Sequence, residues 1–325
     1  MFDAHHDLLT IAYKAYITGD YSYLEKISEA FNNYNVRGAI ANLYFMSREE
    51  MNKELGDNYY RDDVSVYEMF VKAKEVLDTF IPDVEFIYSI EGADYIKDEN
   101  ELEQLYDAGL DSLILCWNTE NKYGSGNRSD KGLTKEGEKL INKAIDLGMG
   151  IDLSHANKNT FYDIIDVISK RKNEGKKVCC YASHSNSKNL CDVSRNLDDD
   201  QLKKIKEVGG LVGAVTVKNF LIDGDIDSNA DYRKAFLDHI EHISNIMGTY
   251  NVMVASDDMN FLKDIVPFDG LLAVYDYNTI NKDMFFDLIS RFGLKDAYAI
   301  TYNNLKEKIY NKLKHNRNNY RRGVR

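Results

Sequence analysis

Short apolar runs rich in β-branched residues recur along this chain and alternate with segments of helical periodicity. This alternation constrains the fold more than any other feature, because a strand followed by a helix, eight times over, is typical of a closed parallel barrel. The sequence therefore predicts an α/β fold, a (β/α)8 barrel of the TIM type, with an open doubly wound sheet as the alternative. The expected strands lie near residues 1–7, 36–47, 84–92, 110–118, 148–155, 176–185, 209–217 and 251–258.

Between the strands, apolar residues fall three and four positions apart, as they do in amphipathic helices. The clearest segments are 65–80, 135–148, 160–172 and 232–248. The chain has 325 residues and contains neither a repeat nor a low-complexity linker, so we expect residues 1–325 to form a single catalytic barrel. Its basic tail, 312–325, is expected to be a solvated helix end rather than a contact for an anionic partner.

The net charge of −12 disfavours binding to nucleic acid or anionic lipid and favours a small-molecule substrate. No apolar run approaches the roughly 20 residues of a membrane helix, and the first residues do not resemble a secretory signal, so a cytoplasmic location is expected. The four cysteines form neither a C-x-x-C pair nor a zinc-ribbon spacing. We expect them to be buried, reduced thiols.

Polar residues gather at the ends of the expected strands, where barrels of this kind build their active sites. Four of the seven histidines are among them. A single histidine at a strand end is more often structural than a ligand, but several on neighbouring strands favour a shared site. These strand-end residues are His5, His6, Asp7, Glu91, His155, His184, Asp257 and Asp258.

Imidazole and carboxylate groups are the ligands that suit zinc and related divalent ions. His5 and Asp7 are two apart on a strand, so both should face one ion, with His6 facing away. His155 and His184 could hold a second ion, with Glu91 bridging the two. Two cations about 3.5–4 Å apart can hold a hydroxide between them and polarise a carbonyl, which suits hydrolysis.

Other arrangements fit less well. Ser154 and Ser183 each precede a histidine, but strand neighbours point to opposite faces and no G-x-S-x-G elbow is present, which disfavours a serine hydrolase. His239 and His242 lack the H-E-x-x-H arrangement of a helical zinc site and are assigned to packing or to the helix surface. The loop 120–132 lacks the order of a phosphate loop and is expected to be a lid or a plain connection.

Four sequence blocks resemble motifs of the membrane (renal) dipeptidases, a family of binuclear zinc peptidases on an amidohydrolase-type barrel. They are "DAHHD" (3–7), "IEG" (90–92), "GLTKEGEKLINKAIDLGMGIDLSH" (132–155) and "SHSN" with the later "SRNL" (183–197). The resemblance implies that one zinc ion is held by His5, Asp7 and Glu91 and the other by Glu91, His155 and His184. It also implies that Arg195 binds the substrate carboxylate and that Asp257 transfers the proton. Members of the family are commonly homodimers, while the sequence itself is silent on oligomeric state.

Two departures from the family pattern bear on the chemistry. Trp117 stands where the renal enzyme has a histidine that contacts the substrate, and an indole can donate one hydrogen bond but cannot accept one or titrate. We therefore expect altered substrate contacts at Trp117 and retained activity. The residues from Asp257 read "DDMN" instead of D-F-D-G. We assign proton transfer to Asp257 rather than to Asp258.

The sequence thus predicts a cytoplasmic zinc dipeptidase with Asp257 and Glu91 in catalysis. Two alternatives stay open. One is a related binuclear metallohydrolase that acts on another amide, a lactam or a pathway intermediate. The other is a non-catalytic protein that binds metal or peptide.

Overall fold

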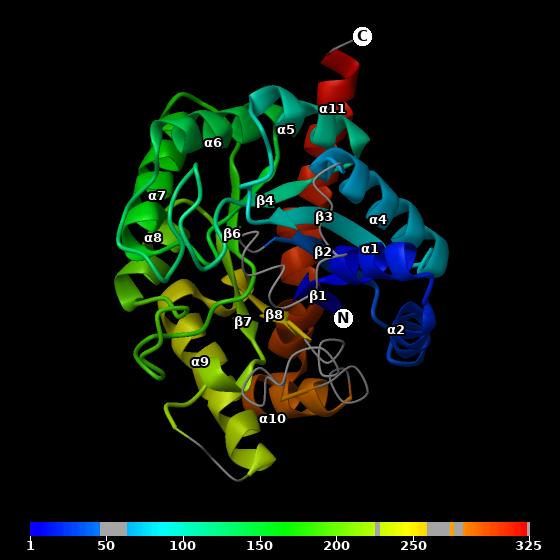
Figure 1. Cartoon of the computed structure of the whole chain (residues 1–325). Helices are drawn as coiled ribbons and strands as arrows, with labels where there is room; N and C mark the ends of the chain where they lie inside the picture. The colour runs from blue at the N-terminus through cyan, green and yellow to red at the C-terminus, as the bar shows by residue number, and fades with distance from the viewer. Residues whose placement is uncertain (46–63, 225–227, 259–273, 276–281, 324–325) are drawn as a thin grey trace.

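Eight parallel strands form the centre of the computed structural model, which describes residues 1–45, 64–224, 228–258, 274–275 and 282–323. Each strand hydrogen-bonds to the next one in sequence order, and helices lie around the sheet (Figure 1). This order confirms the predicted barrel and excludes the doubly wound alternative, whose strand order reverses. The strands are β1 Phe2–His6, β2 Gly38–Tyr44, β3 Glu85–Glu91, β4 Ser112–Ile114, β5 Gly150–Asp152, β6 Cys179–Ala182, β7 Leu211–Val215 and β8 Val252–Ala255.

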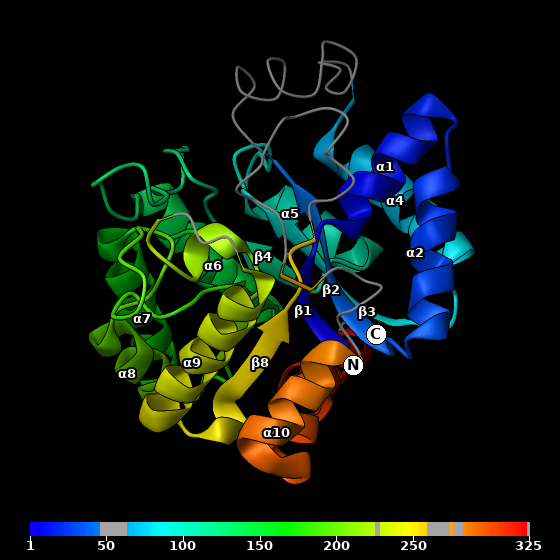
Figure 2. The same ribbon diagram turned by 90° about the horizontal axis from the view of Figure 1, so that it is seen from below.

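The predicted helical segments correspond to α4, α6, α7 and α9, and local signals set their ends. In α4 the Ser65 hydroxyl accepts from the Glu68 amide, and the Glu68 carboxylate accepts from the Ser65 amide in return. Figure 2 shows α1, α2 and α4 on one side of the strands and α6 to α9 on the other. The helices are α1 Leu8–Thr18, α2 Ser22–Asn33, α4 Val66–Phe80, α5 Glu99–Ala108, α6 Lys135–Leu147, α7 Lys158–Asn173, α8 Asp199–Glu207, α9 Asn229–Met247, α10 Asp283–Tyr298 and α11 Asn311–Gly323.

Apolar side chains fill the inside of the barrel below the polar strand ends. Phe2, Ile40, Ile87, Tyr181 and Met253 are fully buried there and belong to one cluster. The cluster also includes Leu305, Ile309 and Leu313 from the C-terminal segment. A filled interior leaves the carboxyl ends of the strands as the place where polar groups can meet a ligand.

Hydrogen bonds accepted by Asp3 join the first strand to the loop that follows the last strand. The carboxylate of Asp3 accepts from the backbone N–H of Ser256 at 2.8 Å and from that of His5 at 3.2 Å. The Asp257 N–H donates to the His5 carbonyl at 3.1 Å. One of the polar groups at the start of the chain therefore has a structural role, because Asp3 fixes the loop after β8 against β1.

The prediction that the basic tail is a solvated helix end is wrong for part of α11. Arg317 is 7% exposed and its Nε donates to Asp111 at 3.1 Å, while Lys314 donates to the other Asp111 oxygen at 2.7 Å. Arg317 also donates to the carbonyls of Tyr106 and Leu110. Charge counting in the sequence could not reveal this contact, because the buried acceptor lies 206 residues away.

Removal of the Arg317 charge is expected to destabilise the fold. Arg317→Met removes a donor from one Asp111 oxygen and from two buried carbonyls, while Lys314 stays on the other Asp111 oxygen, so the free energy of unfolding should fall by about 1–3 kcal/mol in urea titrations. Arg321→Met, an exposed position on the same helix, is the matched control and should change it by less than about 0.5 kcal/mol. Equal effects of the two variants would contradict the structural role of Arg317.

The cysteine prediction is confirmed, since Cys116, Cys179, Cys180 and Cys191 are all buried and free. Across the described ranges, none of the helices has the length and apolar character needed to cross a membrane.

Candidate active site

The predicted site residues come together at the carboxyl end of the barrel. The eight residues to which the sequence analysis gave a metal-binding, substrate-binding or catalytic role all line one cavity of about 340 Å³. Its wall also contains apolar and aromatic side chains, such as Val217 and Phe220, and polar ones, such as Asn127 and Arg128. The eight predicted residues are His5, Asp7, Glu91, Trp117, His155, His184, Arg195 and Asp257.

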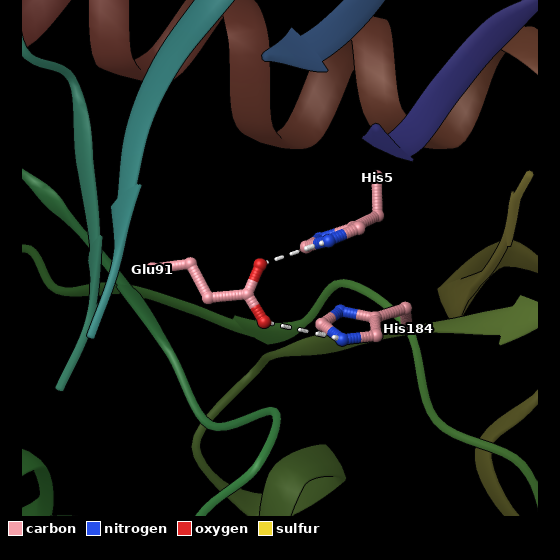
Figure 3. A group of neighbouring side chains, drawn as sticks. All are labelled: His5, Glu91 and His184. Carbon is pink, nitrogen blue, oxygen red and sulfur yellow. Dashed lines mark ion pairs between the residues drawn. The ribbon is translucent and has the colours of Figure 1, made fainter. Parts of the chain in front are cut away.

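Glu91, the last residue of β3, lies at the centre of the polar group. Its Oε2 is 3.1 Å from His5 Nε2, and its Oε1 is 2.7 Å from His155 Nε2 and 3.8 Å from His184 Nε2. Figure 3 shows one oxygen turned toward His5 and the other toward His184, with both rings on the same side of the carboxylate. Oε2 of Glu91 thus faces His5, and Oε1 faces both His155 and His184.

A register shift in β1 directs His5 into this group. Between Asp3 and His6 the first strand contains one residue more than its partner β2, which is the pattern of a β-bulge. Ala4 packs inside the barrel and His5 faces Glu91, so two consecutive side chains turn inward. The expected proximity of His5 and Asp7 is found, with His5 Nε2 and Asp7 Oδ1 4.0 Å apart. Regular strand alternation, however, is not the cause, and Asp7 lies beyond the strand.

His155 and Asp257 reach the cavity through backbone turns rather than from strands. Both have positive φ, +68° at His155 and +46° at Asp257, which is uncommon for residues with side chains. Strained backbone of this kind concentrates at functional sites. Strand alternation therefore does not separate Asp257 from Asp258, because β8 ends at Ala255.

Burial and mutual contact shift the pKa values of these groups strongly. Burial by itself lowers the pKa of His5, but Glu91, Asp257 and Asp7 outweigh it and raise that pKa to about 10. Burial raises the pKa of Glu91, yet His5 and His155 outweigh it and hold that pKa well below the usual range. Burial and Glu91 raise the pKa of Asp7, and burial raises that of Asp257 against the opposing effect of His5. The carboxylates of Asp7, Glu91 and Asp257 therefore all interact with the positive charge of protonated His5.

The donor set fits divalent metal ions. The ligand atoms of His5, Glu91 and His184 lie within 4.8 Å of one another, and so do those of His5, Asp7 and Asp257. Asp7 Oδ1 is buried and has no hydrogen-bond partner among the described residues. A buried carboxylate oxygen without a partner is costly unless a cation occupies the space before it.

Three polar residues that the sequence argument did not place in the site contact the Nδ1 atoms of the imidazoles, on the side of each ring away from Glu91. Asn118 Oδ1 is 2.8 Å from His155 Nδ1, and Asn42 Nδ2 is 3.1 Å from His5 Nδ1. Ser183 Oγ is 3.1 Å from His5 Nδ1 and 2.8 Å from His184 Nδ1. The expectation that Ser183 points away was wrong, because residue 183 follows β6 and is free of its alternation. A polar residue inside the apolar run "GAIANLY" was the available signal for Asn42.

Trp117 and Arg195 both line the cavity. The Trp117 ring stacks on His155 with centroids 6.0 Å apart and lies 5.7 Å from the Tyr44 ring. Arg195 is 7% exposed, its Nη2 donates to the His184 carbonyl at 3.4 Å, and burial lowers its pKa to about 10. Its guanidinium carbon is 5.5 Å from the Phe220 ring centroid. A substrate in this cavity would therefore meet one aromatic wall and one buried cation.

The remaining histidine predictions hold. His239 Nδ1 accepts from the Ser187 N–H at 3.0 Å and its Nε2 donates to the Leu221 carbonyl at 2.9 Å, while His242 pairs with Asp199 at 2.7 Å. Both therefore have packing or surface roles.

Three further sequence features fall outside the ligand groups. His6 and Asp258 are buried and belong to neither candidate metal group. In the loop 120–132 the Asn121 side chain accepts two backbone N–H groups. Of the "DDMN" segment, residues 259 and 260 lie outside the described residues.

Residues 55–297 match the model of a protein family described as membrane dipeptidase, peptidase family M19. A Klebsiella pneumoniae protein known as an uncharacterised protein in the pqqA 5′ region is 35% identical over 178 residues, which are 52% of this chain and 62% of that protein. An uncharacterised dipeptidase of Schizosaccharomyces pombe is 30% identical over 212 residues, or 64% of this chain and 46% of that protein. The chain thus spans less than two thirds of either relative.

A solved structure resembles the whole chain. It is a metallopeptidase from Rhodobacter sphaeroides, crystallised with a phosphinate mimic of the dipeptide L-Ala-D-Ala. The TM-score is 0.71 and the identity 18%, over 96% of this chain and 98% of that one. At this identity the similarity establishes the fold.

Proposed function

The chain belongs to the membrane dipeptidase family of metallopeptidases, peptidase family M19, and from that premise we propose that it is a zinc dipeptidase with two ions in its site. The main support is the convergence of three imidazoles and three carboxylates on one buried cavity that also holds Arg195. A metal group alone would suit many hydrolases. A buried cation beside it suits a small substrate with a free carboxylate.

In this proposal His5, Asp7 and Glu91 hold one zinc ion, and Glu91, His155 and His184 hold the other. The two Glu91 oxygens, which face the two imidazole sets separately, support the bridging role. When bound, two such ions lower the pKa of a water molecule and polarise the scissile carbonyl. Asp257 takes up a proton from the attacking water and delivers it to the departing amine.

Arg195 binds the C-terminal carboxylate of the dipeptide in this proposal, by paired hydrogen bonds. Arg195→Lys is therefore expected to raise KM about 10–100-fold with a smaller change in kcat, because an ammonium cannot reproduce the planar two-donor contact. Steady-state kinetics on a dipeptide and on its C-terminal amide provide the check. If the unaltered enzyme cleaves amides as fast as free acids, the assignment of Arg195 is wrong.

The proposed function is tested by zinc analysis together with a panel of dipeptides. A metallopeptidase of the same fold was crystallised with a mimic of L-Ala-D-Ala, so the panel should contain L,L and L,D dipeptides in equal number. Zinc-dependent cleavage of dipeptides, with tripeptides and N-acyl amino acids uncleaved, is the expected result. Cleavage of a lactam or an acyl-amino acid in their place would favour a related metallohydrolase. Metal binding without any hydrolysis would favour a binding protein.

We further propose that the enzyme acts as one catalytic domain, forms a homodimer and works in the cytoplasm. The packing of α11 on the barrel through Arg317 and Asp111 supports the single domain. Four free buried cysteines are consistent with a reducing compartment.

A further inference from the structure

We propose that Ser183 is a positioning residue that holds two imidazoles, His5 and His184, with their Nε2 atoms facing the metal ions. The inference rests on the proposed function. The Ser183 side chain is fully buried and does not line the cavity, so it acts through its neighbours rather than on the substrate. Its Oγ lies 3.1 Å from His5 Nδ1 and 2.8 Å from His184 Nδ1, and the two ring centroids are only 3.6 Å apart.

The hydrogen count on this hydroxyl fits that role. A serine hydroxyl can accept two hydrogen bonds and donate one. The Nδ1–H groups of His5 and His184 would use both acceptor positions, and the hydroxyl proton would point to Ser154 Oγ, 3.3 Å away. An imidazole with its proton on Nδ1 has a bare Nε2, which is the atom that faces Glu91 in both rings. One oxygen thus selects the metal-binding tautomer of two ligands.

The backbone around Ser183 leaves its hydroxyl little freedom to move. Its N–H donates at 3.0 Å to Asp152, which also accepts from the Ser154 N–H at 3.0 Å. A side chain at Gly213 would place its Cβ 1.8 Å from the Ser183 carbonyl oxygen, so glycine at 213 permits this close approach. The Ser183 backbone is therefore held by β5 on one side of β6 and by β7 on the other.

The two imidazoles do not depend on Ser183 equally. His5 Nδ1 also has the Asn42 amide at 3.1 Å, and with that amide turned by 180° its Oδ1, which otherwise has no hydrogen-bond partner among the described residues, accepts the Nδ1–H. In the described part of the chain Ser183 is the single hydrogen-bond partner of His184 Nδ1. His155, the other imidazole on that side, is oriented separately by Asn118 at 2.8 Å. Loss of the Ser183 hydroxyl should therefore lower the affinity for the ion beside His155 and His184 more than the affinity for the ion beside His5 and Asp7.

The experiment is a zinc titration of metal-free protein against a chromophoric chelator, which yields two dissociation constants. The dissociation constant that disappears in His155→Ala belongs to the ion beside His155 and His184. Ser183→Ala is expected to raise that constant about 10–100-fold, with a smaller change in the other. Asn42→Ala, the matched variant behind the opposite ligand, is expected to show the reverse order. Thermal unfolding of each metal-free variant checks that it is folded.

If Ser183 has a purely structural role, Ser183→Ala will raise both zinc dissociation constants equally or change neither. Either result overturns the inference. Should Ser183→Ala not fold, ¹⁵N histidine NMR of the unaltered zinc-loaded protein decides. The proton is expected on Nδ1 of both His5 and His184, and a proton on Nε2 of either ring overturns the inference. Failure of the unaltered protein to bind zinc would overturn the proposed function as well. Because this readout needs no hydrolysis, loss of the inference alone can be told apart from loss of the function.

Discussion

Asp257→Asn is expected to lower kcat about 10²–10⁴-fold while zinc content and KM change little, because asparagine keeps the shape of the side chain but cannot carry a proton. The carboxylate of Asp257 lies 3.9 Å from His5 Nε2 and on the cavity wall, so it is close to any water held there. Burial raises its pKa above the ordinary value, which makes it a better proton acceptor than an exposed aspartate. Steady-state kinetics with zinc analysis of the same preparation provide the measurement.

Asp258→Asn is the matched control for this prediction. Asp258 is adjacent in sequence and buried, but it belongs to neither candidate metal group and does not line the cavity. Its substitution should leave kcat within a few-fold of the unaltered enzyme. If Asp258→Asn abolishes turnover and Asp257→Asn does not, the proton-transfer role belongs to Asp258. If Asp257→Asn instead loses zinc, Asp257 is a metal ligand, as its place beside His5 and Asp7 would allow.

Removal of metal is expected to abolish dipeptide hydrolysis, and addition of zinc to restore it. Bound metal lowers the pKa of water from 15.7 to about 7, and no side chain of the cavity can replace that effect. The purified protein should contain about two zinc equivalents per chain. His184→Ala should lower this content and leave the fold intact, because the ring contributes one ligand atom and little of the core. Metal analysis, activity and thermal unfolding should be measured on the same sample.

His242→Ala is the control for the metal prediction. His242 is an imidazole on α9 that pairs with Asp199 outside the site, so its loss should change neither zinc content nor activity. A protein that hydrolyses dipeptides at full rate after chelation would contradict the metallopeptidase mechanism. Zinc loss in His242→Ala equal to that in His184→Ala would show that the assigned site is wrong.

The sequence determined the architecture because strand and helix periodicity are local properties. Eight apolar runs with helices between them were sufficient to predict a barrel, and the barrel rule then placed the polar strand ends in one region. Glu91 and the histidines at 5, 155 and 184 could be selected in this way, since each follows or ends an apolar run. The length and order of the motifs were likewise sufficient to indicate the family.

Only the tertiary structure decided in which direction the side chains of those residues point. The direction of His5 depends on a bulge in β1, and those of His155 and Asp257 depend on left-handed turns; none of these has a periodic signature in the sequence. The contact between Ser183 and His5 joins residues 178 positions apart. Local propensity carries no information about such contacts, because they form only when the barrel brings distant strand ends together. The sequence therefore determined which side chains could hold metal, and the closed barrel decided which atoms face one another.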